Sequence, residues 1–351
     1  MPAADVLQRL AEFDTVIDAR SESEFALDHL PLAVNWPTLN DAERITIGTL
    51  YKQVNAFEAK KRGAAVAARN IAMHIEAHVI DKPKDWRPLA YCWRGGKRSG
   101  SLSLILDQIG FRATLVEGGY KAFRAAMLLD IEARAAQLHL RVICGTTGSG
   151  KTRLLQALRK AGAQVIDLED LAKHRSSVLG ALPGQPQPSQ KHFDTLVWDA
   201  MRQCDPTKPV YVESESKKVG NLAIPTALVT AMRNSVCLNL VLEDAHRVKL
   251  LMEDYDFFVR DTESFCTRLL ALTALRGKAT IDTWQERVRS GEIAEVVQEL
   301  LTLHYDPVYI QSMERNFQQF GVAEELRPSD HSNAAMDALA QHIVACEATA
   351  A

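Results

Sequence analysis

Residues 91–100 read YCWRGGKRSG, a pattern typical of a loop that binds an anion beside a reactive thiol. A thiol reacts as its thiolate, and a cysteine between a strand and a helix has backbone N–H groups and the positive helix end directed at its sulfur. Paired glycines permit a tight turn of inward-pointing amides. Cys92 is therefore the predicted reactive residue. The predicted anion cradle consists of Arg94, Gly95, Gly96, Lys97 and Arg98.

The spacing from Cys92 to Arg98 is C-x5-R, which tyrosine-phosphatase loops share with sulfurtransferase loops. The bound anion is accordingly a phosphate, a persulfide or a selenide. A phosphatase loop usually has His before its Cys and a separate Asp as general acid, whereas Tyr91 precedes Cys92 here. The surroundings favour a sulfurtransferase-type loop.

A second loop, GTTGSGKT at residues 145–152, matches G-x-x-x-x-G-K-[ST] between a predicted strand and a predicted helix. In such a P-loop the backbone amides wrap the phosphates and the lysine reaches the terminal pair. The hydroxyl of Thr152 is expected to hold Mg²⁺. The predicted phosphate-binding residues are Gly145, Gly148, Ser149, Gly150, Lys151 and Thr152.

Carboxylates at the ends of neighbouring strands are candidates for helping to hold that metal. Glu213 in VYVESES is the first candidate and Glu215 the second. Asp167 ends another predicted strand and is a candidate for orienting water or substrate. The alternative is that each is an ordinary solvated carboxylate at a strand end.

Local basic clusters are candidate RNA contacts, because the formal net charge of −3 gives no overall attraction to nucleic acid. Each cluster is alternatively a solvated face. The candidate RNA contacts are Lys60, Lys61, Arg62, Lys173 and Arg175.

The elements that position these loops are predicted to form an α/β fold, because short apolar runs alternate with amphipathic helices. We expect a parallel-sheet domain, then a P-loop NTPase-like α/β domain with a helical C-terminal extension. Ser21 and Glu24 predict a capping box at one early helix. The predicted regions are the first domain at 1–130, a helical connector at 131–138, the P-loop domain at 139–245 and a mainly helical region at 246–351.

Composition places the chain among globular proteins, with 47% hydrophobic and 24% charged residues. Its six cysteines include no C-x-x-C pair, so neither a disulfide framework nor a zinc knuckle is suggested. The start has no signal-peptide pattern and no long apolar run follows, so we expect a cytoplasmic protein without a membrane partner.

The stretches IDARSESEF, YCWRGGKRS and LVEGGYKAF together resemble the rhodanese domain, and Asp18 and Arg20 in the first of them are expected to fix its fold. Followed by a P-loop, they resemble the tRNA 2-selenouridine synthase family. That resemblance continues through WPTLNDAER, LYKQVNAFEAKKRG, IDLEDLAKHRSSVLG, PSQKHFD, VYVESESKKVGN and LLTLHYDPVY. Ser176 stands where we expect a glycine, which puts the turn geometry there in doubt.

The resemblance implies an enzyme that replaces sulfur by selenium in 2-thiouridine at the wobble position of tRNAs for lysine, glutamate and glutamine. It implies selenophosphate as selenium donor, an S-geranyl-2-thiouridine intermediate made from geranyl diphosphate, and Cys92 as an S-selanylcysteine. The P-loop then binds either a nucleotide or the diphosphate of the geranyl donor, and the sequence does not distinguish the two.

Two other functions stay open at this point. One is a thiosulfate sulfurtransferase fused to a small-molecule kinase, which would act without tRNA. The other is an RNA-binding ATPase whose rhodanese domain docks a partner, although the intact loop around Cys92 counts against it.

Overall fold

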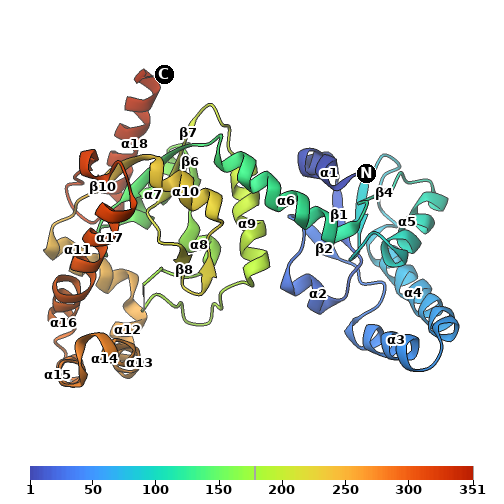
Figure 1. Ribbon diagram of the computed structural model, residues 1–351, viewed down its shortest axis with the longest axis horizontal. Coiled ribbons are helices and arrows are strands. Elements are labelled where there is room, and N and C mark those ends of the chain that lie inside the picture. The colour runs from blue at the N-terminus through green and yellow to red at the C-terminus, as the bar shows by residue number, and fades with distance from the viewer. Residues whose placement is uncertain (178, 351) are drawn as a thin grey trace. The chain divides into compact units, whose positions relative to one another are not determined.

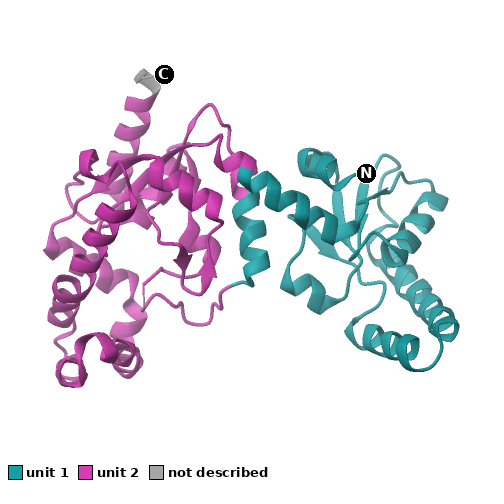
Figure 2. Cartoon of the chain, viewed as in Figure 1, with its two compact units in different colours: residues 1–132, 188–199 teal, residues 133–187, 200–351 magenta. Residues whose placement is uncertain are grey.

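The computed structural model describes residues 1–177 and 179–350, with side chains up to residue 347. The chain forms two compact units (Figure 2). Unit 1 contains residues 1–132 and 188–199, and unit 2 contains residues 133–187 and 200–351. Val178 and Ala351, which belong to two of the predicted stretches, lie outside the described residues.

Unit 1 is built on a parallel four-stranded sheet with strand order β2-β1-β3-β4. The capping box of Ser21 and Glu24 is confirmed at the start of α2. The strands are β1 (Thr15–Asp18), β2 (Ala33–Asn35), β3 (Pro88–Tyr91) and β4 (Thr114–Leu115). The helices are α1 (Ala3–Arg9), a 3-10 turn (Leu10–Glu12), α2 (Glu22–Leu27), α3 (Asp41–Gln53), α4 (Ala56–His78), α5 (Lys97–Ile109) and α6 (Gly119–Ala135).

Unit 2 is built on a second parallel sheet with strand order β11-β10-β5-β7-β6 (Figure 1). Its strands are β5 (His139–Cys144), β6 (Gln164–Ile166), β7 (Pro209–Glu213), β10 (Val236–Leu240) and β11 (Glu324–Leu326), beside a small antiparallel pair, β8 (Lys218–Val219) and β9 (Leu222–Ala223). The helices up to the last strand are α7 (Lys151–Lys160), α8 (Leu168–Ala172), α10 (Thr226–Asn234), α11 (Asp244–Asp254), α12 (Asp256–Arg260), α13 (Thr262–Leu269), α14 (Thr273–Arg276), α15 (Lys278–Arg289), α16 (Ile293–Leu300) and α17 (Asp306–Asn316).

The C-terminal part of the chain completes the P-loop unit. A 3-10 turn (Leu270–Leu272), a π-helical turn (Leu301–Tyr305) and a second 3-10 turn (Phe320–Val322) interrupt its helices. The strand β11 then pairs with β10, and α18 (Asn333–Ala350) packs on α7 through a shared apolar core. The helical character of this region is confirmed, but the edge strand β11 was not expected, because three residues are too few to show a strand period.

The division of the chain differs from the predicted one at α9 (Gln190–Arg202). Its first ten residues belong to unit 1, although the sequence suggests a place in the P-loop domain. The reason is packing within unit 1, where the ring of Trp198 meets Phe123 edge-on and its indole N–H donates to Asp130 at 2.7 Å. Residues 131–135, expected in a separate connector, are the last turn of α6.

Candidate functional site

Cys92 lies between the end of β3 and the start of α5, as the apolar run before it predicts. Its side chain is only 3% exposed. The sulfur accepts hydrogen bonds from the backbone N–H of Gly96 and from the hydroxyl of Ser99, each at 3.2 Å. Both donors belong to the loop and the first turn of α5, so they stabilise negative charge on the sulfur or on an atom bound to it.

A glycine pair at the start of α6 fixes the shape of this loop. Gly119 has a φ of +59°, and a Cβ built there would lie 2.2 Å from the carbonyl oxygen of Cys92. The same carbonyl accepts a hydrogen bond from the N–H of Tyr120 at 2.8 Å, and that of Trp93 accepts one from Lys121 at 3.1 Å. Residues 117–120, EGGY, therefore pack closely against the backbone of the cysteine loop.

A buried polar network lies beneath the loop. The guanidinium of Arg20 pairs with Asp18 at 2.6 Å, and both side chains are fully buried. The hydroxyl of Tyr91 donates to Asp18 at 2.7 Å, and burial raises the pKa of this phenol well above its usual range. The guanidinium also lies 4.1 Å from the ring centre of Tyr120. These contacts tie β1, β3 and α6 together, which agrees with a structural role for Asp18 and Arg20.

The cationic side chains of the loop are not equivalent. Arg98 pairs with Glu24 at 2.6 Å, and Glu24 also contacts Arg44 at 3.2 Å. Arg94 and Lys97 are exposed, and neither is paired with a carboxylate in the described part of the chain. Arg98 thus holds α2 against α5, while Arg94 and Lys97 leave their charge available to an anion from solvent.

The P-loop joins β5 to α7 and is shaped by three glycines with φ between +77° and +152°: Gly145, Gly148 and Gly150. A Cβ at Gly145 would lie 2.6 Å from the carbonyl oxygen of Leu240. The ammonium of Lys151 donates to the carbonyl oxygen of Gly145 at 2.7 Å. The six predicted P-loop residues therefore share one turn, with Ser149 buried and the lysine folded back over the loop.

Two side chains distant in sequence hold the P-loop in place. Arg247 on α11 is 4% exposed, and its Nη2 donates to the carbonyl oxygen of Thr147 at 2.8 Å. The same guanidinium pairs with Asp306 at the start of α17, at 2.6 Å. Tyr309 on α17 accepts a hydrogen bond from the N–H of Gly145 at 2.7 Å. The C-terminal helices thus support the loop through its backbone.

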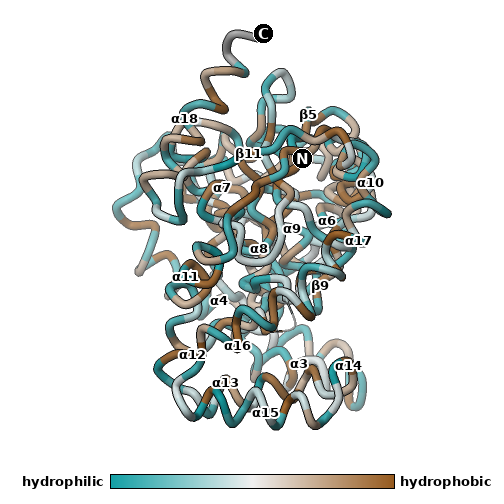
Figure 3. Tube along the Cα trace, turned by 90° about the vertical axis from the view of Figure 1, so that its left-hand side faces the viewer, coloured by the Kyte–Doolittle hydropathy of each residue, from teal (hydrophilic) through white to brown (hydrophobic). Residues whose placement is uncertain are grey.

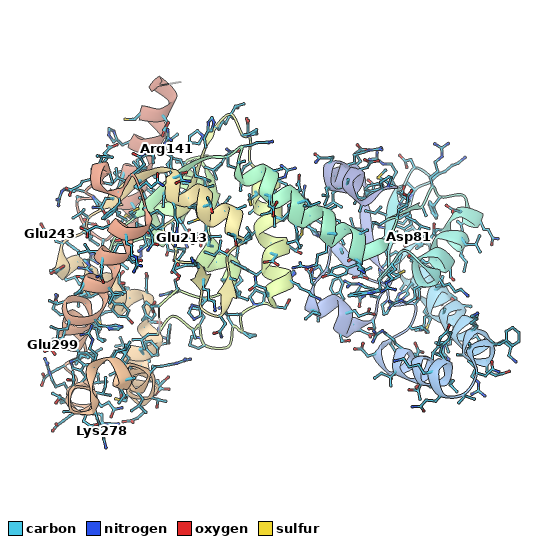
Figure 4. All side chains as sticks on the ribbon, viewed as in Figure 1. Asp81, Arg141, Glu213, Glu243, Lys278 and Glu299 are labelled. Carbon is cyan, nitrogen blue, oxygen red and sulfur yellow. The ribbon has the colours of Figure 1, made fainter. Side chains whose placement is uncertain are left out.

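Four carboxylates lie beside the P-loop: Asp167, Glu213 and Glu215 are buried, and Glu169 is half-buried. Glu213 ends β7, and Figure 4 labels it within unit 2. Burial raises the pKa of Glu213 well above its usual range, and its Oε1 accepts from the N–H of Glu169 at 2.8 Å. Burial also raises the pKa of Glu169 to about 7 and that of Glu215 to about 8. Asp167 is buried with a raised pKa and caps α8 by accepting from the N–H of Asp170 at 2.8 Å.

The donor set beside the P-loop fits a magnesium ion. Thr152 Oγ1 donates to Glu169 Oε2 at 3.3 Å, and Oε2 of Glu213 is buried without a hydrogen-bond partner among the described residues. Oxygen ligands suit Mg²⁺, which usually keeps several waters and takes further ligands from substrate phosphates. Among the residues that the structure describes, no group of three His, Cys, Asp or Glu is arranged to bind a metal without further ligands. Thr152, Glu169 and Glu213 would hold the ion, which would neutralise charge on a bound diphosphate.

The candidate RNA contacts differ in their surroundings. Lys60, Lys61 and Arg62 lie exposed on α4, and Lys61 pairs with Glu58. Lys173 is exposed and pairs with Asp170 at 2.7 Å.

Arg175, the fifth candidate, is held inside unit 2. Its guanidinium donates to the carbonyl oxygen of Asp254 at 2.6 Å and lies 4.5 Å from the ring centre of Tyr255. The exposed lysines therefore suit an RNA contact better than Arg175 does.

Ser176 adopts a φ of +49°, the left-handed region in which glycine is the usual residue. Its hydroxyl donates to the carboxylate of Glu215. The turn that glycine would have made is therefore kept, and the serine adds a hydrogen bond to the carboxylate cluster.

Three residues of the P-loop surroundings escaped the sequence analysis: Glu169, Arg247 and Tyr309. Glu169 follows Asp167 by two positions in IDLEDL, so the acidic pair after a strand was an available signal. Arg247 and Tyr309 lie on helices far along the chain, where nothing in their local sequence indicates a contact with the loop.

Comparison with known proteins gives two domain families and several related proteins. The tRNA 2-selenouridine synthase AAA domain matches residues 138–269, and the rhodanese-like domain matches residues 2–126. The tRNA 2-selenouridine synthase of Alcanivorax borkumensis is 34% identical over 259 residues, which are 72% of this chain and 69% of the relative. This chain belongs to the tRNA 2-selenouridine synthase family. The resemblance seen in the sequence and the α/β fold class are confirmed.

Two further members of the tRNA 2-selenouridine synthase family show how much of the chain aligns. The one from Nitrosomonas europaea is 37% identical over 256 residues, which are 72% of this chain and 66% of the relative. The one from Shewanella denitrificans is 28% identical over 340 residues, which are 88% of this chain and 91% of the relative. None of the described helices combines the length and apolar character needed to cross a membrane.

Proposed function

We propose that this member of the family replaces sulfur by selenium in 2-thiouridine at the wobble position of tRNAs for lysine, glutamate and glutamine. The observation that carries the proposal is the pair of hydrogen bonds from Gly96 and Ser99 to the sulfur of Cys92. They prepare a chalcogen anion on that sulfur, and a P-loop suited to a diphosphate lies on the same chain. Cytoplasmic tRNA is the proposed partner, with Lys60, Lys61, Arg62 and Lys173 as exposed cations for its phosphates.

The first proposed step makes the sulfur of 2-thiouridine a better leaving group. The sulfur forms a bond to C1 of geranyl diphosphate, and the C1–O bond breaks with its electron pair on the diphosphate. The base loses its N3 proton, which gives neutral S-geranyl-2-thiouridine. A P-loop lysine such as Lys151 would stabilise the charge that develops on the diphosphate.

The second proposed step uses an S-selanyl group on Cys92. Its terminal selenium anion adds to C2 of the base, the C2–S bond breaks, and geranylthiolate leaves with the electron pair and takes up a proton. A thiol then attacks the sulfur of Cys92, so that 2-selenouridine is released and Cys92 is left in a mixed disulfide.

Selenophosphate would restore the S-selanyl group. Its selenium attacks the mixed disulfide at the sulfur of Cys92 and expels the thiol, and water then cleaves the Se–P bond to release phosphate. The exposed cations of Arg94 and Lys97 are placed in the loop to attract this anionic donor. No net oxidant is consumed, because the thiol spent in one cycle is returned in the next.

The direct test gives purified protein an anticodon stem-loop RNA containing 2-thiouridine, together with selenophosphate, geranyl diphosphate, Mg²⁺, a thiol and the disulfide of that thiol, which forms the first mixed disulfide at Cys92. Nucleoside mass spectrometry should show 2-selenouridine, and the same RNA with uridine should stay unchanged. Unaltered 2-thiouridine under these conditions would overturn the proposal. Conversion of thiosulfate and cyanide to thiocyanate at a comparable rate would instead favour a plain sulfurtransferase.

A further inference from the structure

An apolar cavity lies beside the P-loop within unit 2. The space free of protein atoms within it and at its opening to solvent is about 520 Å³. Its walls come from α11, α12, α13, α16 and the π-helical turn, and Figure 3 shows apolar stretches recurring along these helices. Its lining includes Thr147, Tyr255, Phe258, Val297, Leu300 and Tyr305.

The cavity and the phosphate-binding loop share a boundary. Thr147 of the P-loop is part of the cavity lining. A Cβ at the next residue, Gly148, would lie 2.9 Å from the side chain of Leu251, which also lines the cavity. A ligand with phosphates on the amides of the P-loop can therefore extend directly into apolar surroundings.

The chemistry of the walls distinguishes between possible ligands. Aromatic rings of Tyr255, Phe258, Phe265 and Tyr305 and aliphatic side chains make up most of the lining. A nucleotide base would leave its ring nitrogens and exocyclic groups without partners there, at a cost that polar groups buried in apolar surroundings always carry. A branched hydrocarbon chain has no such groups and gains from leaving water.

Two guanidinium groups contact residues at the boundary between the cavity and the P-loop. The guanidinium of Arg175 lies over the ring of Tyr255, and that of Arg247 holds the carbonyl oxygen of Thr147. The amides of the P-loop, with Lys151, place an anion-binding region at one end of this apolar cavity. A molecule with an anionic diphosphate at one end and a hydrocarbon chain at the other would match this arrangement of charge and apolar surface.

We propose that this cavity holds the isoprenoid chain of geranyl diphosphate while the P-loop holds the diphosphate. The proposal rests on the function proposed above and assigns the P-loop to the geranyl donor instead of a nucleotide. The reacting C1 atom then lies where the cavity meets Thr147, outside the apolar walls and open to the sulfur of the tRNA base. Val297, whose side chain is half-buried in the cavity wall, limits the space available to the tail.

Isothermal titration calorimetry of the full-length protein tests the assignment. Geranyl diphosphate and inorganic diphosphate are titrated separately into protein that contains Mg²⁺. Geranyl diphosphate should bind on the order of 100-fold more tightly than inorganic diphosphate, because its tail leaves water. Val297→Phe, which fills the cavity, should weaken geranyl diphosphate binding by roughly tenfold or more and leave inorganic diphosphate binding unchanged. Retained diphosphate binding also shows that the variant is folded. Val322→Phe, at a position 80% exposed, is the matched control and should bind both ligands as the parent does.

Equal affinity for the two diphosphates, or a Val297→Phe variant that binds geranyl diphosphate normally, would overturn the inference. So would ATP binding that is tighter than geranyl diphosphate binding and sensitive to Val297→Phe. The outcome is separable from that of the proposed function. Selenation in the nucleoside assay with no effect of Val297→Phe on the KM for geranyl diphosphate would refute the cavity alone, whereas tight, Val297-dependent binding without selenation would refute the function alone.

Discussion

The two anion-binding loops of this chain share one architecture. They differ in how many of the groups that would stabilise a bound anion are already in place. Both follow a buried parallel strand and open a helix, and both need glycines with positive φ. The sulfur of Cys92 already has its two hydrogen-bond donors. In the P-loop, Lys151 is bonded to the backbone of its own loop, and the carboxylates nearby have raised pKa values.

This difference indicates which partner each loop requires. Under the proposed function the cysteine loop holds an atom bound covalently to one sulfur, and two hydrogen bonds at that sulfur stabilise its local charge. The P-loop brings a cation and several buried carboxylates together, and their repulsion is relieved only by protons or by a metal ion with its phosphates. The two loops therefore suit successive steps with different substrates, and separate substitutions should divide those steps.

Cys92→Ser should have the largest effect on the cysteine loop. Selenium incorporation should fall by at least on the order of 1,000-fold, because a hydroxyl cannot carry the selenium as a selenosulfide. Geranylation of 2-thiouridine should continue at the parent rate. Cys346→Ser, at an exposed thiol on α18, is the control and should be fully active in both steps. Selenation by the Cys92 variant would show that the sulfur is not the carrier.

Lys151→Ala should have the next largest effect and should act on the other loop. Geranyl transfer should fall by roughly 100-fold to 1,000-fold, since one preorganised charge on a leaving diphosphate is removed. Selenation of RNA that already carries S-geranyl-2-thiouridine should stay near the parent rate. Lys160→Ala, on the surface of the same helix, provides the control. Equal loss of both steps would indicate a general role in folding or in tRNA binding.

Gly119→Ala should lower the stability of the protein, because residues 117–120 pack closely against the cysteine loop. The new Cβ would lie 2.2 Å from the carbonyl oxygen of Cys92 and 2.4 Å from the N atom of Gly95, so backbone must move. We expect a loss of about 2–4 kcal/mol in unfolding free energy, measured by urea denaturation. Gly100→Ala in α5 meets no atom within 4 Å and should raise stability by up to about 1 kcal/mol. Unchanged stability in the Gly119 variant would show that the loop yields at little cost.

Glu215→Gln should give the smallest effect, visible in the pH dependence of stability. Burial raises the pKa of Glu215 from its ordinary 4.5 to about 8, so the folded state binds more protons than the unfolded state between these values. Stability from this group is therefore lost as pH rises through that window. At pH 8.5 the variant should exceed the parent by on the order of 2 kcal/mol, and near pH 4 the two should converge. Glu324→Gln, at an exposed position, is the control, and its stability should follow that of the parent at every pH. The same result for Glu215→Gln would show that the carboxylate of Glu215 is solvated.

The sequence was informative wherever the signal is local. Apolar runs followed by glycine-rich stretches placed Cys92 and the P-loop between the correct strands and helices, because a buried parallel strand and the turn after it are short-range features. The left-handed backbone at Ser176 was foreseeable in another way, because the family resemblance leads us to expect a glycine there.

Contacts between distant segments could not be read in the same way. The guanidinium of Arg247 meets Thr147 and Asp306, which are 100 and 59 positions away. The assignment of α9 to unit 1 depends on the packing of Trp198 against α6. Such contacts follow from how elements pack in three dimensions, so they leave no periodic pattern along the chain.

Mass spectrometry of tRNA nucleosides from cells lacking this gene product, complemented with the parent, the Cys92→Ser variant or the Lys151→Ala variant, tests the division of labour most directly. We expect 2-selenouridine with the parent, S-geranyl-2-thiouridine with the Cys92 variant and unmodified 2-thiouridine with the Lys151 variant. Accumulation of the same nucleoside with both variants would contradict the assignment of two successive steps to two loops.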